Sequence, residues 1–301
     1  MKYDCCCLIV IMAIMVASVL PVEVAPYVWG EQLNESPRLV GEQGDVLLVR
    51  ISLADHPLTV VGTFLRRQVP FVSVGDGPDY VGLLGIDMQD TPGSYALKIK
   101  ASYPDHTVPM SMSVRVINHA YPVQRLTLPR TMVDLDKNTL VRVKAEAKTI
   151  KNVFLGLTKE RWWMSAFVKP VEGKVSGRFG SQRIINGAPR SPHSGEDIAA
   201  PRGTAVVAMN EGMVRLTMDH FFTGKGVIID HGLGLFSMYF HLSAIEVDQD
   251  QRVRKGQVIG KVGSTGRATG PHLHWGVRLN GARVNPYALL SIPAEGFSQP
   301  E

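Results

Sequence analysis

Cysteine is nearly absent from this sequence. The chain has 301 residues and three cysteines, which are adjacent at Cys5, Cys6 and Cys7. The remainder of the chain therefore forms no disulfide bond. A metal site there must use histidine and carboxylate ligands instead of thiolates.

Long apolar runs are equally scarce. The one run of note extends from Cys5 to Leu20 and follows a single lysine, which is typical of a signal-peptide core and short for a membrane span. We expect residues 1–25 to be a signal peptide, cleaved after Ser18 or Ala25, or an uncleaved membrane anchor, because neither cleavage site is well formed. Both alternatives predict an exported protein of the periplasm or cell envelope, whose contact with the membrane is limited to this segment.

A strong charge bias and low-complexity tracts are also absent. The net charge is +5, a mild excess that suits an anionic polymer such as cell wall and is equally common in proteins without one. We expect no nucleic-acid partner. The hydrophobic fraction of 45% and the charged fraction of 20% are those of a globular protein, and the length allows two domains with separate cores.

Residues 26–120 have the pattern of short antiparallel strands. Apolar and polar residues alternate in segments such as 110–117, and turn residues such as Asp90-Thr-Pro-Gly-Ser94 separate the segments. Strands at this spacing over about 90 residues predict an immunoglobulin-like β-sandwich. Because it contains no catalytic cluster, we expect a spacer or a docking module, either for an envelope protein partner or for another part of this chain.

Residues 121–160 predict a linker with one amphipathic helix. Asp136 is a good N-cap, and apolar residues recur after it at three- and four-residue steps, with lysine and arginine between them. These apolar residues are Leu140, Val143, Ala147, Ile150 and Phe154. We expect this helix to bridge the two domains.

Residues 161–290 again have the pattern of short strands separated by glycine turns, and a tail follows at 291–301. Zinc catalysis needs three protein ligands, an open coordination position and groups that move protons. This region supplies the required residue types in fixed order: His193, Asp197, His241, His272 and His274. The sequence therefore predicts a zinc hydrolase with one Zn²⁺ per chain.

The spacing of these residues favours strands and loops over a helix. His193 and Asp197 are four residues apart, but Pro192 precedes them and Gly195 separates them, so a loop that enters a strand fits better than the His-Glu-x-x-His helix of other metallopeptidases. His272 and His274 are two apart, and on a strand both imidazoles face one cleft. One of them is expected to bind zinc while its neighbour moves protons.

These motifs resemble the catalytic domain of the lysostaphin/LytM-type zinc endopeptidases, the twenty-third metallopeptidase family. The similarity covers residues 165–287, somewhat under half of the chain, and leaves the N-terminal sandwich out. It rests on His193-x-x-x-Asp197, Tyr239-x-His241-Leu-Ser, Val253-x-x-Gly-Gln-x-Ile-Gly260, Gly263-x-Thr-Gly266 and Gly270-Pro-His-Leu-His-Trp275.

The resemblance implies a role for each residue. His193, Asp197 and His274 are expected to bind zinc, while His241 and His272 form the catalytic pair that orients and deprotonates the attacking water. It further implies an all-β, two-domain protein whose C-terminal domain is a LytM-type antiparallel β-sheet peptidase. The implied activity is hydrolysis of peptide bonds in peptidoglycan stem peptides or cross-links, without Glu196 as a base.

The sequence departs from the lysostaphin branch at one place. Members of that branch often carry a tyrosine shortly before the first zinc histidine, whereas residues 183–192 contain none. Arg190, Asn186 or the backbone are the candidates to line the cleft instead.

Three alternatives to a peptidase agree less well with the sequence. A non-catalytic LytM-type activator or wall-binding protein is typically recognised by lost ligands, and all five positions are intact here. Residues 253–263 also suit the hairpins of biotin and lipoyl carriers, but no Met-Lys-Met turn is present. A glycosidase needs a matched carboxylate pair, which we do not find.

Overall fold

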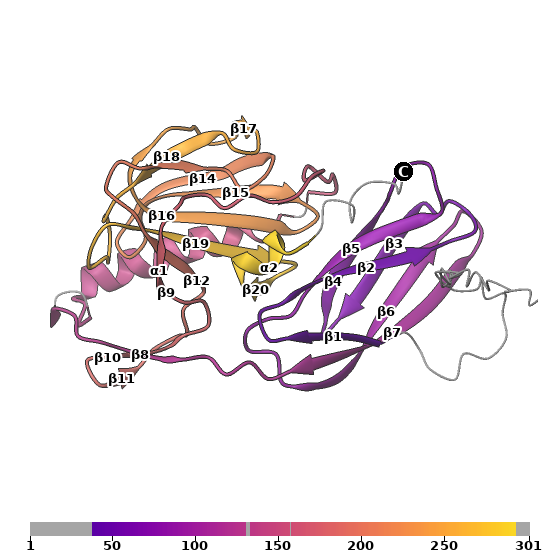
Figure 1. The fold of residues 1–301 in the computed structure, drawn as a ribbon, viewed down its shortest axis with the longest axis horizontal. Coiled ribbons are helices and arrows are strands. Elements are labelled where there is room, and N and C mark those ends of the chain that lie inside the picture. The colour runs from indigo at the N-terminus through magenta and orange to yellow at the C-terminus, as the bar shows by residue number, and fades with distance from the viewer. Residues whose placement is uncertain (1–37, 131–132, 157, 293–301) are drawn as a thin grey trace, which may run out of the picture. The chain divides into compact units, whose positions relative to one another are not determined.

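The computed structural model describes residues 38–130, 133–156 and 158–292, and these are mostly β-structure (Figure 1). All of them belong to one compact unit, residues 36–301. The signal or anchor segment at 1–25 and nearly all of the tail at 291–301 lie outside the described residues. No helix within these ranges has the length and apolar character needed to cross a bilayer.

Seven strands form the N-terminal part: β1 (Arg38–Glu42), β2 (Val46–Ser52), β3 (Thr59–Phe64), β4 (Arg67–Ser73), β5 (Asp79–Gly85), β6 (Gly93–Ser102) and β7 (Thr107–Ile117). They pair in the order β1-β7-β6-β3-β4-β5-β2. The pairing of β1 with β7 is parallel and the others are antiparallel.

The predicted period of two is visible in β6. Leu97, Ile99 and Ala101 are fully buried in the core, whereas Lys98 and Lys100 between them are exposed. The alternation therefore gives the strands one apolar face, as the sequence predicts. Hydrogen bonding follows one continuous path through all seven strands, and the immunoglobulin-like arrangement in two sheets stays a prediction.

Helix α1 (Lys137–Val153) begins where the sequence predicts it. The Asp136 carboxylate accepts hydrogen bonds from the backbone N–H groups of Asn138 and Thr139 at 2.8 and 3.0 Å. These bonds satisfy two donors that the first helical turn leaves unpaired.

The C-terminal end of the apolar stripe of α1 packs against the C-terminal sheet, whereas Leu140 and Ala147 of the stripe are exposed. Ile150 and Phe154 lie against a buried cluster that includes Met218 and Phe236, and the Glu146 carboxylate accepts a hydrogen bond from the backbone N–H of Phe221 at 2.9 Å. The helix therefore packs on the outside of the C-terminal sheet, and its role as a bridge between two domains stays a prediction.

The C-terminal part is a 10-stranded sheet whose central path runs β17-β14-β15-β16-β19-β12-β9. Strand β18 joins β13 to β16, and β20 extends β19. The strands are β9 (Lys174–Gly177), β12 (Gly195–Ala199), β13 (Ala205–Val207), β14 (Gly212–His220), β15 (Gly224–Gly232), β16 (Leu235–Ile245), β17 (Arg252–Val253), β18 (Val258–Val262), β19 (His272–Leu279) and β20 (Ala282–Val284), followed by helix α2 (Pro286–Leu290). All pairings are antiparallel, as predicted.

A separate 3-stranded sheet has the order β11-β10-β8. Strand β8 (Val123–Leu126) comes from the segment predicted as a linker, and β10 (Gln182–Ile185) and β11 (Ala188–Pro189) form a hairpin just before the first candidate zinc ligand. Strand β8 pairs with β10 in parallel. The linker is thus hydrogen-bonded to the C-terminal domain at this point.

A buried histidine lies within β15. His231 is fully buried, and its Nδ1–H donates to the Glu211 carbonyl at 2.6 Å while its Nε2 lies 2.7 Å from the Ser237 hydroxyl. Burial lowers the pKa of His231 to about 4, against a smaller opposing effect of the hydrogen bond to Glu211 and the neighbouring charge of Asp230.

We predict that His231 makes the fold acid-sensitive. The unfolded chain binds its proton near pH 6.5 and the folded chain only near pH 4, so the free energy of unfolding falls between these values as the pH falls. The loss attributable to this residue is about 3 kcal/mol. Denaturant unfolding at pH 7 and pH 4 should show a smaller fall for His231→Gln than for the wild type, and the wild-type fall for exposed His56→Gln. An unchanged fall in His231→Gln would contradict this prediction.

Candidate metal centre and active site

The site is built on the pairing of β12 with β19. Asp197 lies directly opposite His274 in this antiparallel ladder, so their side chains share one face of the sheet. His272 projects from the same face because it is two residues from His274. Leu273 and Trp275 alternate with these histidines and are fully buried in the core on the other face.

Three ligand atoms converge on this face. His193 Nε2 lies 2.9 Å from His274 Nδ1 and 3.0 Å from Asp197 Oδ1, and the latter two atoms are 2.8 Å apart. His193 comes from the loop that enters β12, as the sequence predicts. Two imidazoles and one carboxylate form a donor set that zinc takes in hydrolases.

The spacing and the tautomer of these ligands fit a zinc ion. A tetrahedral site with bonds of about 2.0–2.1 Å separates its ligand atoms by roughly 3.3 Å, so the three atoms need to spread by only a few tenths of an ångström. The His193 Nδ1–H donates to the Arg178 carbonyl at 3.0 Å. Its Nε2 therefore carries a lone pair directed at His274 and Asp197.

The protonation states suit a metal ligand set. Burial lowers the pKa of His193 to about 4, so its imidazole is neutral at neutral pH. Burial acts to raise the pKa of Asp197, but hydrogen bonds with His193 and His274 outweigh this and hold it well below its usual range. The site thus offers a carboxylate and neutral histidine, which are the forms that bind metal.

His241 and His272 face each other beside the ligands. Their ring centroids are 4.7 Å apart. The Nδ1–H of His241 donates to the Thr265 carbonyl and that of His272 to the Gly270 carbonyl, both at 2.8 Å. Each ring therefore keeps a free lone pair on Nε2, and the Nε2 of His272 lies 3.8 Å from Asp197 Oδ1.

His241 has an uncommon backbone conformation. Its φ angle is 63°, in the left-handed region where a non-glycine residue stores about 1–3 kcal/mol of strain. Its N–H donates to the Thr223 carbonyl at 2.9 Å, and the Thr265 hydroxyl donates to the next residue's carbonyl, that of Leu242, at 2.8 Å. Burial lowers the pKa of His241 to about 3, with the charges of His274 and His272 adding to the effect, so the ring is neutral at neutral pH.

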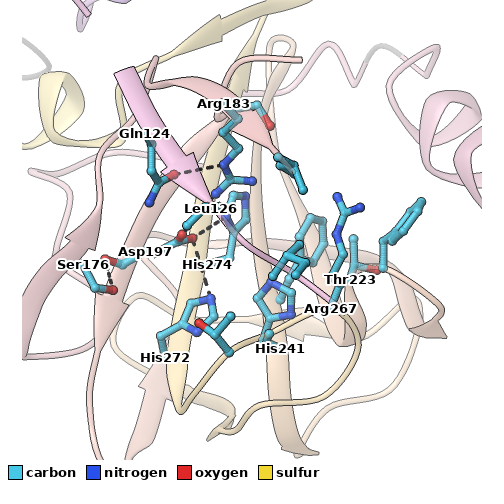
Figure 2. Close-up of a pocket in the computed structure, with 17 residues that line it drawn as sticks. Gln124, Leu126, Ser176, Arg183, Asp197, Thr223, His241, Arg267, His272 and His274 are labelled. Atoms are coloured by element: carbon cyan, nitrogen blue, oxygen red, sulfur yellow. Dashed lines mark hydrogen bonds and ion pairs between the residues drawn. The ribbon is translucent and has the colours of Figure 1, made fainter. Parts of the chain in front are cut away.

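Arg183 connects the carboxylate of Asp197, a candidate metal ligand, to strand β8. Its guanidinium donates to Asp197 Oδ2 at 3.3 Å and to Gln124 Oε1 in β8, also at 3.3 Å (Figure 2). Because Oδ1 of Asp197 points to the two histidines, the two carboxylate oxygens have separate partners. Arg183 therefore orients the Asp197 ligand, a role that the sequence analysis missed.

A cleft of about 380 Å³ is lined by four of the five residues, and the fifth, His193, is buried against the other two candidate ligands. The lining also includes Leu126 and Leu128 of the linker, Ile185 of β10, and Phe222 and Arg267. The predicted peptidase domain begins at residue 161, so part of the cleft lining comes from a segment that precedes this domain.

Two predicted lining residues lie elsewhere. The Asn186 side-chain amide bonds the backbone of Leu128 at 2.9 and 3.0 Å, and Arg190 is exposed. Neither is among the residues that line the cleft, where Arg183 and Arg267 are found instead. Because β10 places alternate residues on opposite faces, Arg183 at its centre reaches inward.

Glu196 and the five other histidines lie outside the cleft lining. Glu196 is buried on the opposite face of β12 from Asp197, where its carboxylate accepts a hydrogen bond from the Phe179 N–H at 3.1 Å. Burial raises its pKa to about 7. Those histidines are His56, His106, His119, His220 and His231.

Comparison with known proteins identifies relatives of this region. The sequence model of peptidase family M23 matches residues 191–286, which include all five site residues. The chain is 42% identical over 138 residues to the peptidoglycan DD-endopeptidase ShyA of Vibrio cholerae, covering 43% of this chain and 32% of ShyA. It is 45% identical over 107 residues to the DD-carboxypeptidase/endopeptidase Mpg of Neisseria meningitidis, covering 36% of this chain and 24% of Mpg. The matched segments thus span about a quarter to a third of these relatives.

A solved structure matches over a longer stretch. A crystal structure of a protein from Pseudomonas aeruginosa assigned to peptidase family M23 superposes with a TM-score of 0.63 and 31% sequence identity. The match covers 82% of this chain and 93% of that chain. This share is larger than the 161–290 region, so the likeness includes part of the N-terminal strands.

We predict that Gly177→Ala weakens zinc binding without replacing a ligand. Gly177 lies in β9 beside Asp197, and an added methyl group would collide with the carboxylate, 3.0 Å from its Cγ. Displacement of this ligand should weaken zinc binding roughly 10- to 100-fold, as measured by competition with a chelator.

Gly156→Ala is the matched control, because its methyl group would meet only the Val153 carbonyl at 3.8 Å. This variant should bind zinc as the wild type does. A folded Gly177→Ala protein with wild-type zinc affinity would contradict the assignment of Asp197.

Proposed function

Since the chain belongs to peptidase family M23, we propose that it is an exported zinc metalloendopeptidase that hydrolyses peptide bonds in peptidoglycan stem peptides or cross-links. One observation carries the proposal. Three ligand atoms lie within reach of one metal ion, and two imidazoles with free Nε2 lone pairs face each other beside them.

Each residue has a distinct part in the proposed reaction. His193, Asp197 and His274 hold the zinc ion. A zinc ion held there would supply Lewis-acid chemistry, which polarises a carbonyl group and makes water a nucleophile at neutral pH. Arg183 keeps the Asp197 carboxylate in position through its Oδ2 atom.

His241 and His272 move the protons. The Thr265 and Gly270 carbonyls fix their Nδ1–H groups, so both Nε2 atoms are available to accept the proton of the attacking water. The imidazolium formed in this way then donates a proton to the leaving amine. No carboxylate is needed as a base, which agrees with the position of Glu196 on the face of β12 opposite to Asp197.

The substrate class follows from the relatives. ShyA is named as a peptidoglycan DD-endopeptidase and Mpg as a DD-carboxypeptidase/endopeptidase, and a peptidoglycan peptide is the corresponding substrate for this chain. The expected signal or anchor at residues 1–25 places the enzyme in the envelope, where that substrate is found. We assign the N-terminal strands to an immunoglobulin-like module that docks to the wall or to an envelope protein.

The catalytic unit begins earlier than residue 161 in this proposal. Strand β8 supplies Gln124, Leu126 and the adjoining Leu128 to the cleft and its supports. A fragment that starts at Arg161 would lack this wall. The non-catalytic activator is less well supported, because all five site residues are present and converge.

We predict that variants of the zinc ligands lose both zinc and activity, whereas a variant of the proton-transfer pair loses activity and keeps its zinc. His274→Ala and Asp197→Ala should lose zinc and hydrolysis of isolated peptidoglycan together, since each removes one of three ligands. His272→Ala should keep its zinc and lose about 10²- to 10⁴-fold in rate. Metal analysis and product release, measured on the same full-length preparations, test this.

Exposed His106→Ala serves as the matched control and should retain both zinc and activity. If His272→Ala emptied the site while His274→Ala kept its zinc, the assignment within the pair would be reversed. Full activity in every variant would refute the proposed function.

A further inference from the structure

Arg267 is a cationic group in the cleft that has no acidic partner among the described residues. Its side chain lines the cleft together with His241 and Phe222. Its guanidinium lies 4.1 Å from the centroid of the Phe222 ring. Within the described residues, no hydrogen bond or ion pair of this guanidinium is found, and Figure 2 shows no dashed line to it.

The other two arginines nearby differ from it. Arg183 is engaged with Gln124 and Asp197, and Arg190 is exposed and does not line the cleft. Asp197 is the only carboxylate in the lining, and its two oxygens already contact His193, His274 and Arg183. No acidic group of the described cleft is therefore left for Arg267.

Without a bound anion, the charged form of Arg267 is in an unfavourable environment. Burial lowers the pKa of Arg267, and the positive charges of Arg183 and Arg190 lower it further. A partly buried guanidinium among like charges is stabilised by an anion that it can bind through two parallel hydrogen bonds. The Phe222 ring holds one face of the guanidinium, which leaves its edge for a planar carboxylate.

Arg267 lies in the loop whose carbonyl groups hold both histidines of the proposed catalytic pair. It follows Thr265, whose carbonyl fixes His241, and precedes Gly270, whose carbonyl fixes His272. Its own N–H donates to the Phe222 carbonyl at 2.9 Å, which fastens this loop to the cleft wall. An anion bound here would lie next to the proposed reaction centre.

We propose that Arg267 is a specificity-determining residue that binds a free carboxylate of the substrate peptide beside the scissile bond. This inference rests on the proposed function and narrows it to acidic peptides. The enzyme discriminates between a peptide that carries this carboxylate and the same peptide with a carboxamide in its place.

The test compares matched substrates on the full-length, zinc-loaded protein. The substrates are a cross-linked peptidoglycan peptide and variants in which one free carboxyl at a time is a carboxamide. The wild type should cleave the parent with a kcat/KM roughly 10- to 100-fold above that of one carboxamide variant, as expected for a charge-assisted bidentate pair.

Arg267→Met should lower kcat/KM for the parent to the level of that carboxamide variant and leave the carboxamide rate unchanged. Arg267→Lys should retain an intermediate preference, because the charge remains and the planar fork is lost. Arg190→Met, which removes the same charge nearby, should keep the wild-type preference. Zinc content should equal that of the wild type in all three variants.

Equal losses on both substrates in Arg267→Met would overturn the inference and make Arg267 a residue that only shapes the loop. No carboxylate preference in the wild type would overturn it as well. If the wild type cleaves none of the peptides, the proposed function fails separately. Calorimetric measurement of the binding of the same peptides then tests the role of Arg267 alone. Tighter binding of the free carboxylate that Arg267→Met abolishes would support the inference, and equal binding would overturn it.

Discussion

The register between β12 and β19 is the constraint on which this site depends. Asp197 stands opposite His274 in the ladder, so one antiparallel pairing brings together ligands that are 77 residues apart in the chain. Because side chains alternate along a strand, a slip of one residue would turn His272 and His274 into the core and Trp275 into the cleft. Burial of Leu273 and Trp275 on one face of β19 therefore fixes the register that directs His272 and His274 to the other face.

Backbone carbonyl groups in loops orient three of the imidazoles that the strands and loops bring together. The Arg178, Thr265 and Gly270 carbonyls each accept an Nδ1–H, and all three imidazoles consequently present Nε2 to the cleft. The fourth imidazole differs from these three, because His274 directs its Nδ1 atom at His193 and Asp197. The cleft is cationic around a single carboxylate, which favours an anionic group on the peptide that enters it.

Local pattern was sufficient to predict strands such as β6, the helix N-cap at Asp136 and the shared face of His272 and His274. Their physical basis is periodicity and spacing within a few residues. The role of Arg183 and its contact with Gln124 was not predictable, because it depends on a parallel pairing between strands 59 residues apart. The helix stripe around Ile150 and Phe154 revealed an apolar face but not its partner, so the sequence could not show that it packs on the C-terminal sheet.

The most direct test is mass spectrometry of fragments that the full-length, zinc-loaded protein releases from purified peptidoglycan, with His272→Ala as the control. The proposed function predicts new amine and carboxyl ends within the stem peptides or cross-links, produced by the wild type and not by the control. These ends also identify the bond that is cut. The absence of new ends with a folded, zinc-loaded wild type would contradict the assignment of this cleft as a peptidoglycan endopeptidase.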